Sequence, residues 1–253
     1  MRPTVTAPRP LIAGNWKMHG LEASLAEARA LAAFVDVRPP AARVAICPPA
    51  TLIHRMAGLL AGSTILVGGQ DCRAEPAGAF TGDLSAEMLA DAGARLVILG
   101  HSERRAGHGE SDAGVAAKVA AALRAGLEPI VCVGETLEQR GAGAAITVVA
   151  AQIEASLPPS LNGRPFVIAY EPVWAIGSGL TPRLDEIEEI HGAIRRVLTG
   201  LFGREGEAVP ILYGGSVKPA NAADILNAYE VGGALVGGAS LKAVEFAVII
   251  EAI

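Results

Sequence analysis

The sequence predicts a single-domain α/β fold, a closed (β/α)8 barrel. Two observations lead there: short apolar runs alternate with longer alanine-rich segments, and the apolar runs number eight. They lie at residues 10–14, 43–47, 64–69, 95–100, 128–134, 166–170, 209–215 and 233–238. Each run is almost continuously hydrophobic, as strands buried on both faces require.

Helical patterns fill the segments between these runs. Residues 21–35 repeat apolar side chains at spacings of three and four. Residues 110–126 begin with Ser111, a suitable N-cap, and end with Gly126, a suitable C-cap. In residues 181–198, Thr181 suits the N-cap, and Pro182 suits the first helical position. Strands that alternate with helices predict βαβ units and a parallel sheet.

The length of the chain favours closure of that sheet. The chain has 253 residues, and about 250 residues are typical of a barrel with eight βα units. An open, doubly wound sheet is the alternative that the pattern alone leaves open. Since no linker or break in composition marks a second domain, we expect one catalytic barrel domain over residues 1–253.

Composition excludes several classes of protein. Hydrophobic residues make up 51% of the chain and charged residues 19%, which excludes a disordered protein. No run of 18 or more apolar residues predicts a membrane span. The first residues lack an apolar segment of signal-peptide length, so we expect a cytoplasmic protein. The formal net charge of −5 argues against a nucleic-acid partner.

The sequence predicts neither a metal site nor a cofactor. Cys47, Cys72 and Cys132 are odd in number and widely spaced, and no C-x-x-C motif occurs. A disulfide framework or a zinc site is therefore not expected. We expect Cys132, on the fifth predicted strand, to be a buried thiol, and its reactivity stays open.

In a (β/α)8 barrel, active residues lie at the carboxyl ends of the strands. Glu171 follows the sixth predicted strand, where partial loss of water suits a carboxylate to act as a base. Pro172 stiffens the exit, and residues 173–179 combine apolar side chains with glycines, as a lid over a site would. The alternative is a structural glutamate paired with an arginine.

Two further strand ends carry groups suited to acid–base chemistry. His101 follows the fourth strand, and a helical turn that starts at Ser102 would direct its N–H groups toward the imidazole. The positive end of a helix disfavours imidazolium, so a neutral imidazole could donate a hydrogen bond to a carbonyl oxygen. Lys17, two residues after Asn15, could bind a dianion or an oxyanion. Taken alone, such a histidine is more often structural and such a lysine solvated. The other histidines are interpreted as structural: His19, His54, His108 and His191.

The seventh and eighth strands end in glycine clusters. Residues 213–219 read YGGSVKP and residues 236–242 read VGGASLK. Small residues allow an anion to approach backbone N–H groups, and a following helix start adds a favourable dipole. Barrels frequently bind phosphate after strands seven and eight, so the two clusters predict a phosphate cup.

Six segments, taken together, resemble one known family. AGNWKMHG, GAFTGDLS, GHSERR, YEPVWAIGSG, YGGSV and LVGGASL follow one another as in the triosephosphate isomerases. The resemblance covers essentially the whole chain. It implies a TIM barrel without a cofactor that interconverts D-glyceraldehyde 3-phosphate and dihydroxyacetone phosphate through an enediolate. This step belongs to glycolysis and gluconeogenesis.

The resemblance also implies a role for each site residue. Asn15 and Lys17 would bind the substrate, and His101 would polarise its carbonyl group. Glu171 would be the base that moves a proton between adjacent carbons. Glu103 would hold the hydrogen bonds around Lys17 and His101. Backbone N–H groups for the phosphate would come from Gly177, Ser216, Gly237 and Gly238.

A homodimer is likewise implied by the resemblance. Residues 74–83 resemble the protruding interface loop of the family, where Thr81 would reach the partner's site near Asn15 and His101. Asp83 stands where the family commonly has glutamate, facing an arginine such as Arg104 across the interface. Two more positions depart from the usual residues of the family, and we expect them to affect local stability. Gly232 stands where an aspartate is common, and the segment 140–145 lacks a lysine often found there.

Two alternative functions stay open beside the isomerase. Another phosphosugar enzyme on the same barrel, such as an epimerase or an indole-forming lyase, would share the phosphate cup but differ in base and lid. A non-catalytic binding role is the second alternative. The presence of Lys17, His101 and Glu171 argues against binding as the only role.

Overall fold

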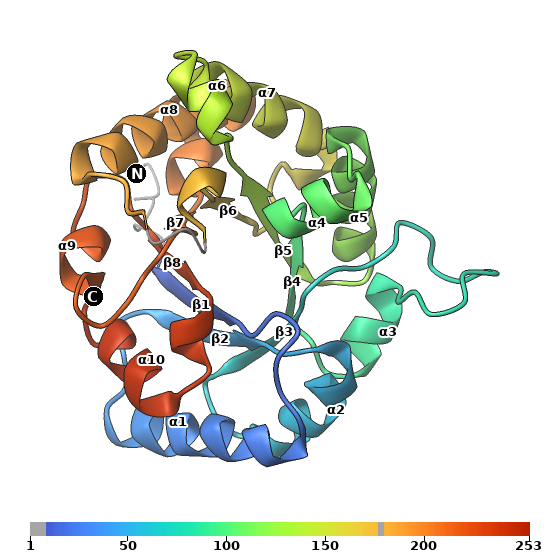
Figure 1. The fold of residues 1–253 in the computed structure, drawn as a ribbon. Coiled ribbons are helices and arrows are strands. Elements are labelled where there is room, and N and C mark those ends of the chain that lie inside the picture. Colours follow the sequence, from blue (N-terminus) through green and yellow to red (C-terminus); the bar gives the residue numbers. More distant parts are fainter. Residues whose placement is uncertain (1–8, 177–179) are drawn as a thin grey trace, which may run out of the picture.

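The computed structural model describes residues 9–176 and 180–253, and in them eight parallel strands close into a barrel (Figure 1). The strands are β1 (Leu11–Asn15), β2 (Arg43–Cys47), β3 (Leu66–Gly69), β4 (Leu96–Leu99), β5 (Glu128–Val133), β6 (Val167–Tyr170), β7 (Ile211–Tyr213) and β8 (Gly233–Val236). Each strand pairs with its neighbours in chain order, and β8 pairs with β1. The predicted barrel is confirmed, with strand ends shifted by up to two residues, and the open sheet is excluded.

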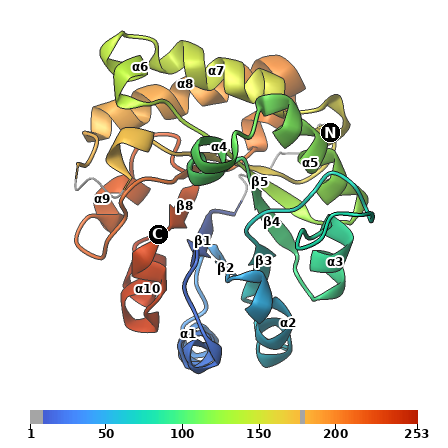
Figure 2. The ribbon, with the colours of Figure 1, turned by 45° about the vertical axis from the view of Figure 1, so that its right-hand side comes forward.

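Helices surround the barrel on the outside (Figures 1 and 2). The α-helices are α1 (Leu25–Val37), α2 (Ala50–Leu59), α3 (Ala86–Asp91), α4 (Ser102–His108), α5 (Asp112–Arg124), α6 (Leu137–Gly141), α7 (Ala145–Ser156), α8 (Leu184–Phe202), α9 (Ala222–Leu226) and α10 (Ala243–Ile250). Short 3₁₀ turns are η1 (Glu22–Ser24), η2 (Pro159–Leu161), η3 (Val173–Ala175), η4 (Gly203–Ala208) and η5 (Gly238–Ser240). That the single domain extends over all 253 residues stays a prediction.

Alternating strand residues build two apolar layers, which explains why the runs are hydrophobic throughout. Side chains of one set meet inside the barrel: Leu11, Ala13, Ala45, Cys47, Leu96, Ile98, Ile130, Cys132, Val167, Ala169, Leu212 and Leu235. The other set packs outward against the helices. Gly68 is required by this packing, since a Cβ there would lie 2.3 Å from Leu96 Cδ1. A filled interior leaves only the strand ends for a site.

The predicted helix starts have different outcomes. Ser111 is the N-cap of α5, as predicted, and its Oγ accepts a hydrogen bond from the Gly114 N–H at 3.2 Å. Gly126 follows that helix with a left-handed φ of 74°. The predictions of Thr181 as N-cap and of Pro182 as the first helical residue are wrong, because α8 begins at Leu184 with Arg183 as its N-cap. The Glu186 carboxylate accepts from the Arg183 N–H at 2.8 Å, and this contact determines the start.

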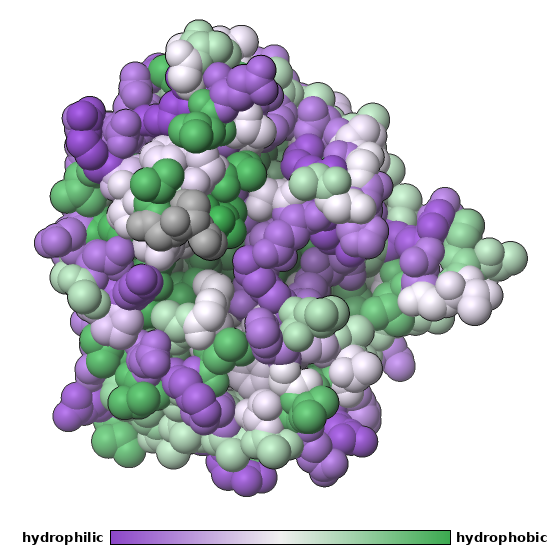
Figure 3. All heavy atoms as spheres, in the orientation of Figure 1, coloured by the Kyte–Doolittle hydropathy of each residue, from purple (hydrophilic) through white to green (hydrophobic). Residues whose placement is uncertain are grey.

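The carboxyl ends of the strands meet on one face of the barrel. On this face, hydrophilic residues gather around the centre (Figure 3). The connection between β3 and α3 extends far from the body of the molecule (Figures 1 and 3). Within residues 9–176 and 180–253, no helix is long and apolar enough to cross a membrane. In the same residues, no cluster of histidine, cysteine and carboxylate side chains suits a metal ion.

Candidate active site

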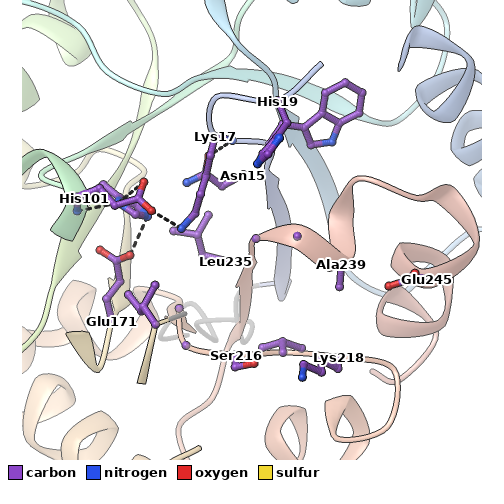
Figure 4. A pocket seen from close by; sticks show the side chains of 18 of the residues that line it. Asn15, Lys17, His19, His101, Glu171, Ser216, Lys218, Leu235, Ala239 and Glu245 are labelled. Carbon is purple, nitrogen blue, oxygen red and sulfur yellow. Dashed lines mark hydrogen bonds and ion pairs between the residues drawn. The ribbon is translucent and has the colours of Figure 1, made fainter. Parts of the chain in front are cut away.

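A cavity of about 520 Å³ opens at the carboxyl ends of the strands. Among its lining residues are the predicted Asn15, Lys17, His101, Glu103, Glu171, Ser216, Gly237 and Gly238. Figure 4 shows His101 and Glu171 along one side of this pocket, with Ser216 and Lys218 on a separate loop. Gly177, the remaining predicted phosphate ligand, lies outside the described residues. The topology therefore brings together residues that are up to 223 positions apart, Asn15 and Gly238.

Lys17 reaches the pocket from a backbone conformation that lysine rarely adopts. Its φ is 52°, in the left-handed region. Asn15, buried at the end of β1, accepts a hydrogen bond from the Lys17 N–H at 2.9 Å through Oδ1. Gln70 donates through Nε2 to the Lys17 and Cys47 carbonyl oxygens, both at 2.9 Å. Asn15 and Gln70 together hold the backbone from which the ammonium extends.

Lys17 is paired with Glu103 across the pocket wall. The Lys17 Nζ lies 2.6 Å from the Glu103 Oε1. Partial burial is the largest influence and acts to raise the pKa of the Glu103 carboxyl. The hydrogen bond from Lys17 and the electrostatic attraction of His101 and Lys17 together outweigh it, and the pKa lies below its usual value. Glu103 thus stays ionised and positions the ammonium. Only 28% of the Lys17 side chain is exposed, so this is not the freely solvated lysine that the sequence left open.

His101 is the N-cap of α4 and lies two residues after the end of β4. Its Nδ1 accepts a hydrogen bond from the Glu103 N–H at 3.2 Å. An acceptor at Nδ1 places the ring proton on Nε2, which is a neutral imidazole. Nδ1 also lies 3.7 Å from Glu103 Oε2. An ion pair between them would require a proton on Nδ1, but Nδ1 already accepts the hydrogen bond from the Glu103 N–H. The imidazole therefore presents one N–H group, at Nε2.

Glu171 follows β6 and is only 1% exposed. Its Oε1 lies 2.9 Å from His101 Nε2, and its Oε2 accepts from the Ser102 N–H at 2.9 Å. Its carboxylate is paired with His101 and Ser102, in place of the arginine of the structural alternative. Two glycines make room for Glu171. A Cβ at Gly214 would lie 2.9 Å from its side-chain Cγ, and one at Gly134 would lie 1.7 Å from its backbone carbonyl oxygen.

The glycine clusters 213–219 and 236–242, which the sequence predicts to form a phosphate cup, line the pocket. Hydrogen bonds to carbonyl groups stabilise the second cluster, and both are called the glycine cup below. Ser240 donates through Oγ to the Gly237 carbonyl oxygen at 2.7 Å. Trp16 in turn donates through Nε1 to the Ser240 carbonyl oxygen at 3.1 Å. Gly14 on β1 permits this approach, because a Cβ there would lie 2.7 Å from Ser240 Cβ. The cup is thereby attached to the first strand, which also carries Asn15.

A buried carboxylate lies beneath the start of the predicted lid. Glu135 is 0% exposed, and its Oε1 accepts from Tyr170 Oη at 3.1 Å, Trp174 Nε1 at 2.9 Å and Arg140 Nη1 at 3.2 Å. Glu135 thereby joins the end of β6 to η3. Residues 177–179 lie outside the described residues, so the lid itself stays a prediction.

Several pocket residues were missed by sequence reasoning. His19, interpreted as structural, lines the pocket, as do Leu235 and Lys218. Gln70, which holds the Lys17 backbone, was also missed. His19 lies within the segment AGNWKMHG and Lys218 within YGGSVKP, and these positions were the available signal. For Gln70 the sequence carries no local signal, because its contacts are more than twenty residues away.

Cys132 lies inside the barrel next to the base. It is fully buried, as expected from the sequence. Burial raises the pKa of its thiol well above the usual value, and the neighbouring Glu171 carboxylate raises it further. A thiol of this kind is a poor nucleophile, because the thiolate is the reactive form.

The predicted interface residues lie away from the pocket of their own chain. Thr81 is exposed on the connection between β3 and α3. Asp83 pairs with Arg73 at 2.6 Å. Arg104 pairs within the chain with Asp71 at 2.8 Å and with Glu110 at 2.7 Å. The pairing of Asp83 with Arg104 across an interface stays a prediction.

Fold and site together define a class. A (β/α)8 barrel in which a carboxylate, a neutral imidazole and an ammonium group meet beside a glycine cup is a barrel enzyme built for proton transfer on a small anionic substrate. The family model described as triosephosphate isomerase matches residues 10–253. The chain belongs to the triosephosphate isomerase family, which confirms the predicted family and the predicted enzyme class.

Individual relatives agree with this assignment. A triosephosphate isomerase from Caulobacter vibrioides is 62% identical over 248 residues, which cover 98% of each chain. One from Afipia carboxidovorans is 59% identical over 244 residues, which cover 96% of this chain and 97% of the relative. A crystal structure of triosephosphate isomerase from Bartonella henselae is 48% identical and has a TM-score of 0.91. It covers 96% of this chain and 98% of that chain.

Proposed function

We propose that this pocket interconverts D-glyceraldehyde 3-phosphate and dihydroxyacetone phosphate through an enediolate, with Glu171 as the base. The observation that carries the proposal is the meeting of Glu171 and His101 at 2.9 Å. A base for a carbon-bound proton and a donor for the neighbouring oxygen are the two groups that an aldose–ketose isomerisation needs. The reaction is the triose phosphate step of glycolysis and gluconeogenesis.

Binding uses the cup and the lysine. The phosphate dianion accepts hydrogen bonds from the backbone at Ser216, Gly237 and Gly238, with Gly177 as a further donor. Lys17 supplies the nearby positive charge, and Asn15 keeps its backbone in place. A cavity of about 520 Å³ accommodates a three-carbon phosphate. Backbone N–H groups and an ammonium are well suited to a dianion.

Proton transfer begins with an exchange of hydrogen bonds. In the structure, the N–H groups of His101 and Ser102 both point at the Glu171 carboxylate. When substrate enters, its carbonyl oxygen replaces Glu171 as the acceptor for His101 Nε2–H. The released carboxylate removes the proton from the adjacent carbon and returns it to the carbon of the original carbonyl group. The hydroxyl proton passes from the second oxygen to the first through His101 Nε2, so a new hydroxyl and a new carbonyl group form. His101 and Lys17 stabilise the negative charge that develops on the oxygens.

The segment after Glu171 completes the site in this proposal. Residues 173–179 close over the substrate and exclude water, which limits loss of phosphate from the enediolate. The anchoring of Trp174 on the buried Glu135 supports this role, since it provides a fixed end for a closing segment. Triosephosphate isomerases are themselves a standard example of such loop closure.

The protein is further proposed to be a cytoplasmic homodimer, in which Thr81 reaches the partner's pocket near Asn15 and His101. The extension of the β3–α3 connection away from its own body supports this arrangement (Figure 1). Light scattering should give twice the chain mass of 25.8 kDa. Thr81→Arg should shift the protein toward monomers and lower turnover. A fully active monomeric wild type would contradict the dimer.

The substrate class is tested by comparing two phosphosugars. Wild-type protein is assayed with D-glyceraldehyde 3-phosphate and with D-ribulose 5-phosphate under the same conditions. The proposal predicts rapid isomerisation of the triose and no measurable reaction of the pentose. Turnover of the pentose in place of the triose would support another phosphosugar enzyme. Binding of inorganic phosphate without turnover of either sugar would support the non-catalytic role.

A further inference from the structure

One asparagine outside the pocket controls the shape of the loop after β7. Asn221 accepts a hydrogen bond through Oδ1 from the Lys218 N–H at 2.7 Å. The same side chain donates through Nδ2 to the Ser216 carbonyl oxygen at 3.1 Å. Its own backbone N–H donates to the Lys218 carbonyl oxygen at 3.1 Å. Three hydrogen bonds of one residue thus enclose the segment from Ser216 to Lys218.

The Asn221 side chain does not cap the helix that it precedes. Asn221 is the N-cap residue of α9, where an asparagine ordinarily accepts from the backbone N–H groups of the helix. Here its side chain makes no hydrogen bond to the helix. It turns back toward the pocket loop instead. The amide therefore stabilises the loop rather than the first turn of α9.

These contacts fix the orientation of two peptide groups. The C=O and N–H groups of a planar trans peptide point in opposite directions. With the Ser216 C=O directed at Asn221, the Val217 N–H points away from Asn221. With the Lys218 N–H directed at Asn221, the Val217 C=O is fixed as well. Residues 214–219 line the pocket, whereas Asn221 is not among its lining residues.

We propose that Asn221 is a positioning residue for phosphate binding, acting through the backbone of Ser216 and Val217. The inference rests on the proposed function, in which the Ser216 N–H of this loop binds the substrate phosphate. That N–H belongs to the peptide group directly before the two that Asn221 holds. Without Asn221, the loop samples other peptide orientations, and the bound phosphate must select the productive one. The cost falls on the binding of the phosphate group and not on the proton transfer between carbons.

The experiment compares two substrates that differ only in the phosphate. Asn221→Ala is assayed with D-glyceraldehyde 3-phosphate and with D-glyceraldehyde, and inhibition by inorganic phosphate is measured in parallel. We expect about a tenfold loss of kcat/KM for the phosphorylated triose, as for one lost hydrogen bond. Inhibition by phosphate should weaken similarly. The slow reaction of D-glyceraldehyde should stay unchanged.

Two further variants sharpen the comparison. Asn221→Asp keeps the acceptor for the Lys218 N–H but replaces the donor to Ser216 with a negative charge. It should lose more activity than Asn221→Ala with the phosphorylated triose and none with D-glyceraldehyde. Asn227→Ala is the matched control, because Asn227 lies at the other end of α9 and donates to the Ala223 carbonyl oxygen at 2.7 Å. It should leave both reactions unchanged.

Each outcome decides the proposal. A loss confined to the phosphorylated substrate in both Asn221 variants supports it. Equal losses with both substrates would show a general structural role and overturn it, as would unchanged phosphate inhibition. Failure of the proposed function is a separate result, because the wild type itself would then not convert D-glyceraldehyde 3-phosphate.

Discussion

The Nε2 of His101 lies 2.9 Å from the Oε1 of Glu171, so the two groups with opposite tasks in proton transfer face each other directly. They come from the ends of β4 and β6, 70 positions apart in the chain. Because Nδ1 accepts a hydrogen bond from the Glu103 N–H, the imidazole has one N–H group, at Nε2. Glu171 accepts the hydrogen bond from this group. A substrate carbonyl must take over this hydrogen bond, and that exchange couples binding to release of the base.

Replacement of His101 tests the donor. His101→Gln removes the imidazole N–H that would polarise the carbonyl, so kcat should fall about 100-fold or more. Inhibition by inorganic phosphate should stay close to that of wild type, because the cup is unchanged. His108→Gln, an exposed position at the end of the same helix, is the control. An unchanged kcat in His101→Gln would exclude the histidine from catalysis.

Lys17 tests the role of the positive charge. Lys17→Met keeps the length of the side chain and removes the ammonium that lies 2.6 Å from Glu103. We expect kcat/KM to fall at least about 100-fold, since a hydrogen bond to a charged group and the field at the developing oxyanion are both lost. Lys242→Met, which removes an exposed lysine paired with Glu27 outside the pocket, should change kcat/KM little. Wild-type kinetics in Lys17→Met would contradict the proposed binding mode.

Gly134 tests how tightly the ends of β5 and β6 pack. A Cβ there would lie 1.7 Å from the Glu171 carbonyl oxygen, so Gly134→Ala forces the two strand ends apart. The free energy of unfolding should fall by about 3 kcal/mol or more, and turnover should fall with it. Gly107→Ala, where a Cβ meets nothing within 4 Å in helix α4, should be neutral or stabilising. Thermal melting of the two variants measures this difference. Equal melting temperatures of Gly134→Ala and Gly107→Ala would contradict the tight packing at Gly134.

Buried His191 predicts a loss of stability in acid. Burial lowers the pKa of this histidine from 6.5 to about 4. The unfolded chain therefore binds a proton near pH 6.5, whereas the folded chain binds one only near pH 4, so acid favours unfolding. The contribution of neutral His191 to the free energy of unfolding is fully present above pH 6.5. It is lost as the pH falls toward 4, by about 3 kcal/mol in total.

His191→Gln provides the comparison for that prediction. Unfolding in urea at pH 7.5 and at pH 4.5, at one protein concentration, gives the free energies of both proteins. The variant lacks this titrating group, so the difference between wild type and variant should shrink as the pH falls. A difference that stays constant with pH would show that His191 titrates equally in both states.

The sequence predicted the barrel because its signal is repeated eight times, and each apolar run has to be buried on two sides. It predicted which side chains meet in the pocket because active residues of such a barrel lie at the carboxyl ends of its strands, and their catalytic roles stay a prediction. Gln70 and Glu135 were missed for a physical reason. Gln70 binds Lys17 and Cys47, and Glu135 binds Tyr170 and Trp174. These partners are more than twenty residues away, so the roles depend on tertiary contacts that no local pattern encodes. Thr181 was a reasonable N-cap, but the carboxylate of Glu186 placed the helix start at Arg183.

The role of Glu171 as the base is tested by the turnover of D-glyceraldehyde 3-phosphate by wild type and by Glu171→Gln. Glutamine keeps the shape of the side chain and removes its basicity. Glu189→Gln, an exposed position on α8, is the control. We expect kcat to fall about 10³-fold or more in Glu171→Gln, with inhibition by inorganic phosphate retained. A Glu171→Gln protein that turns over at the rate of wild type would show that another group moves the proton.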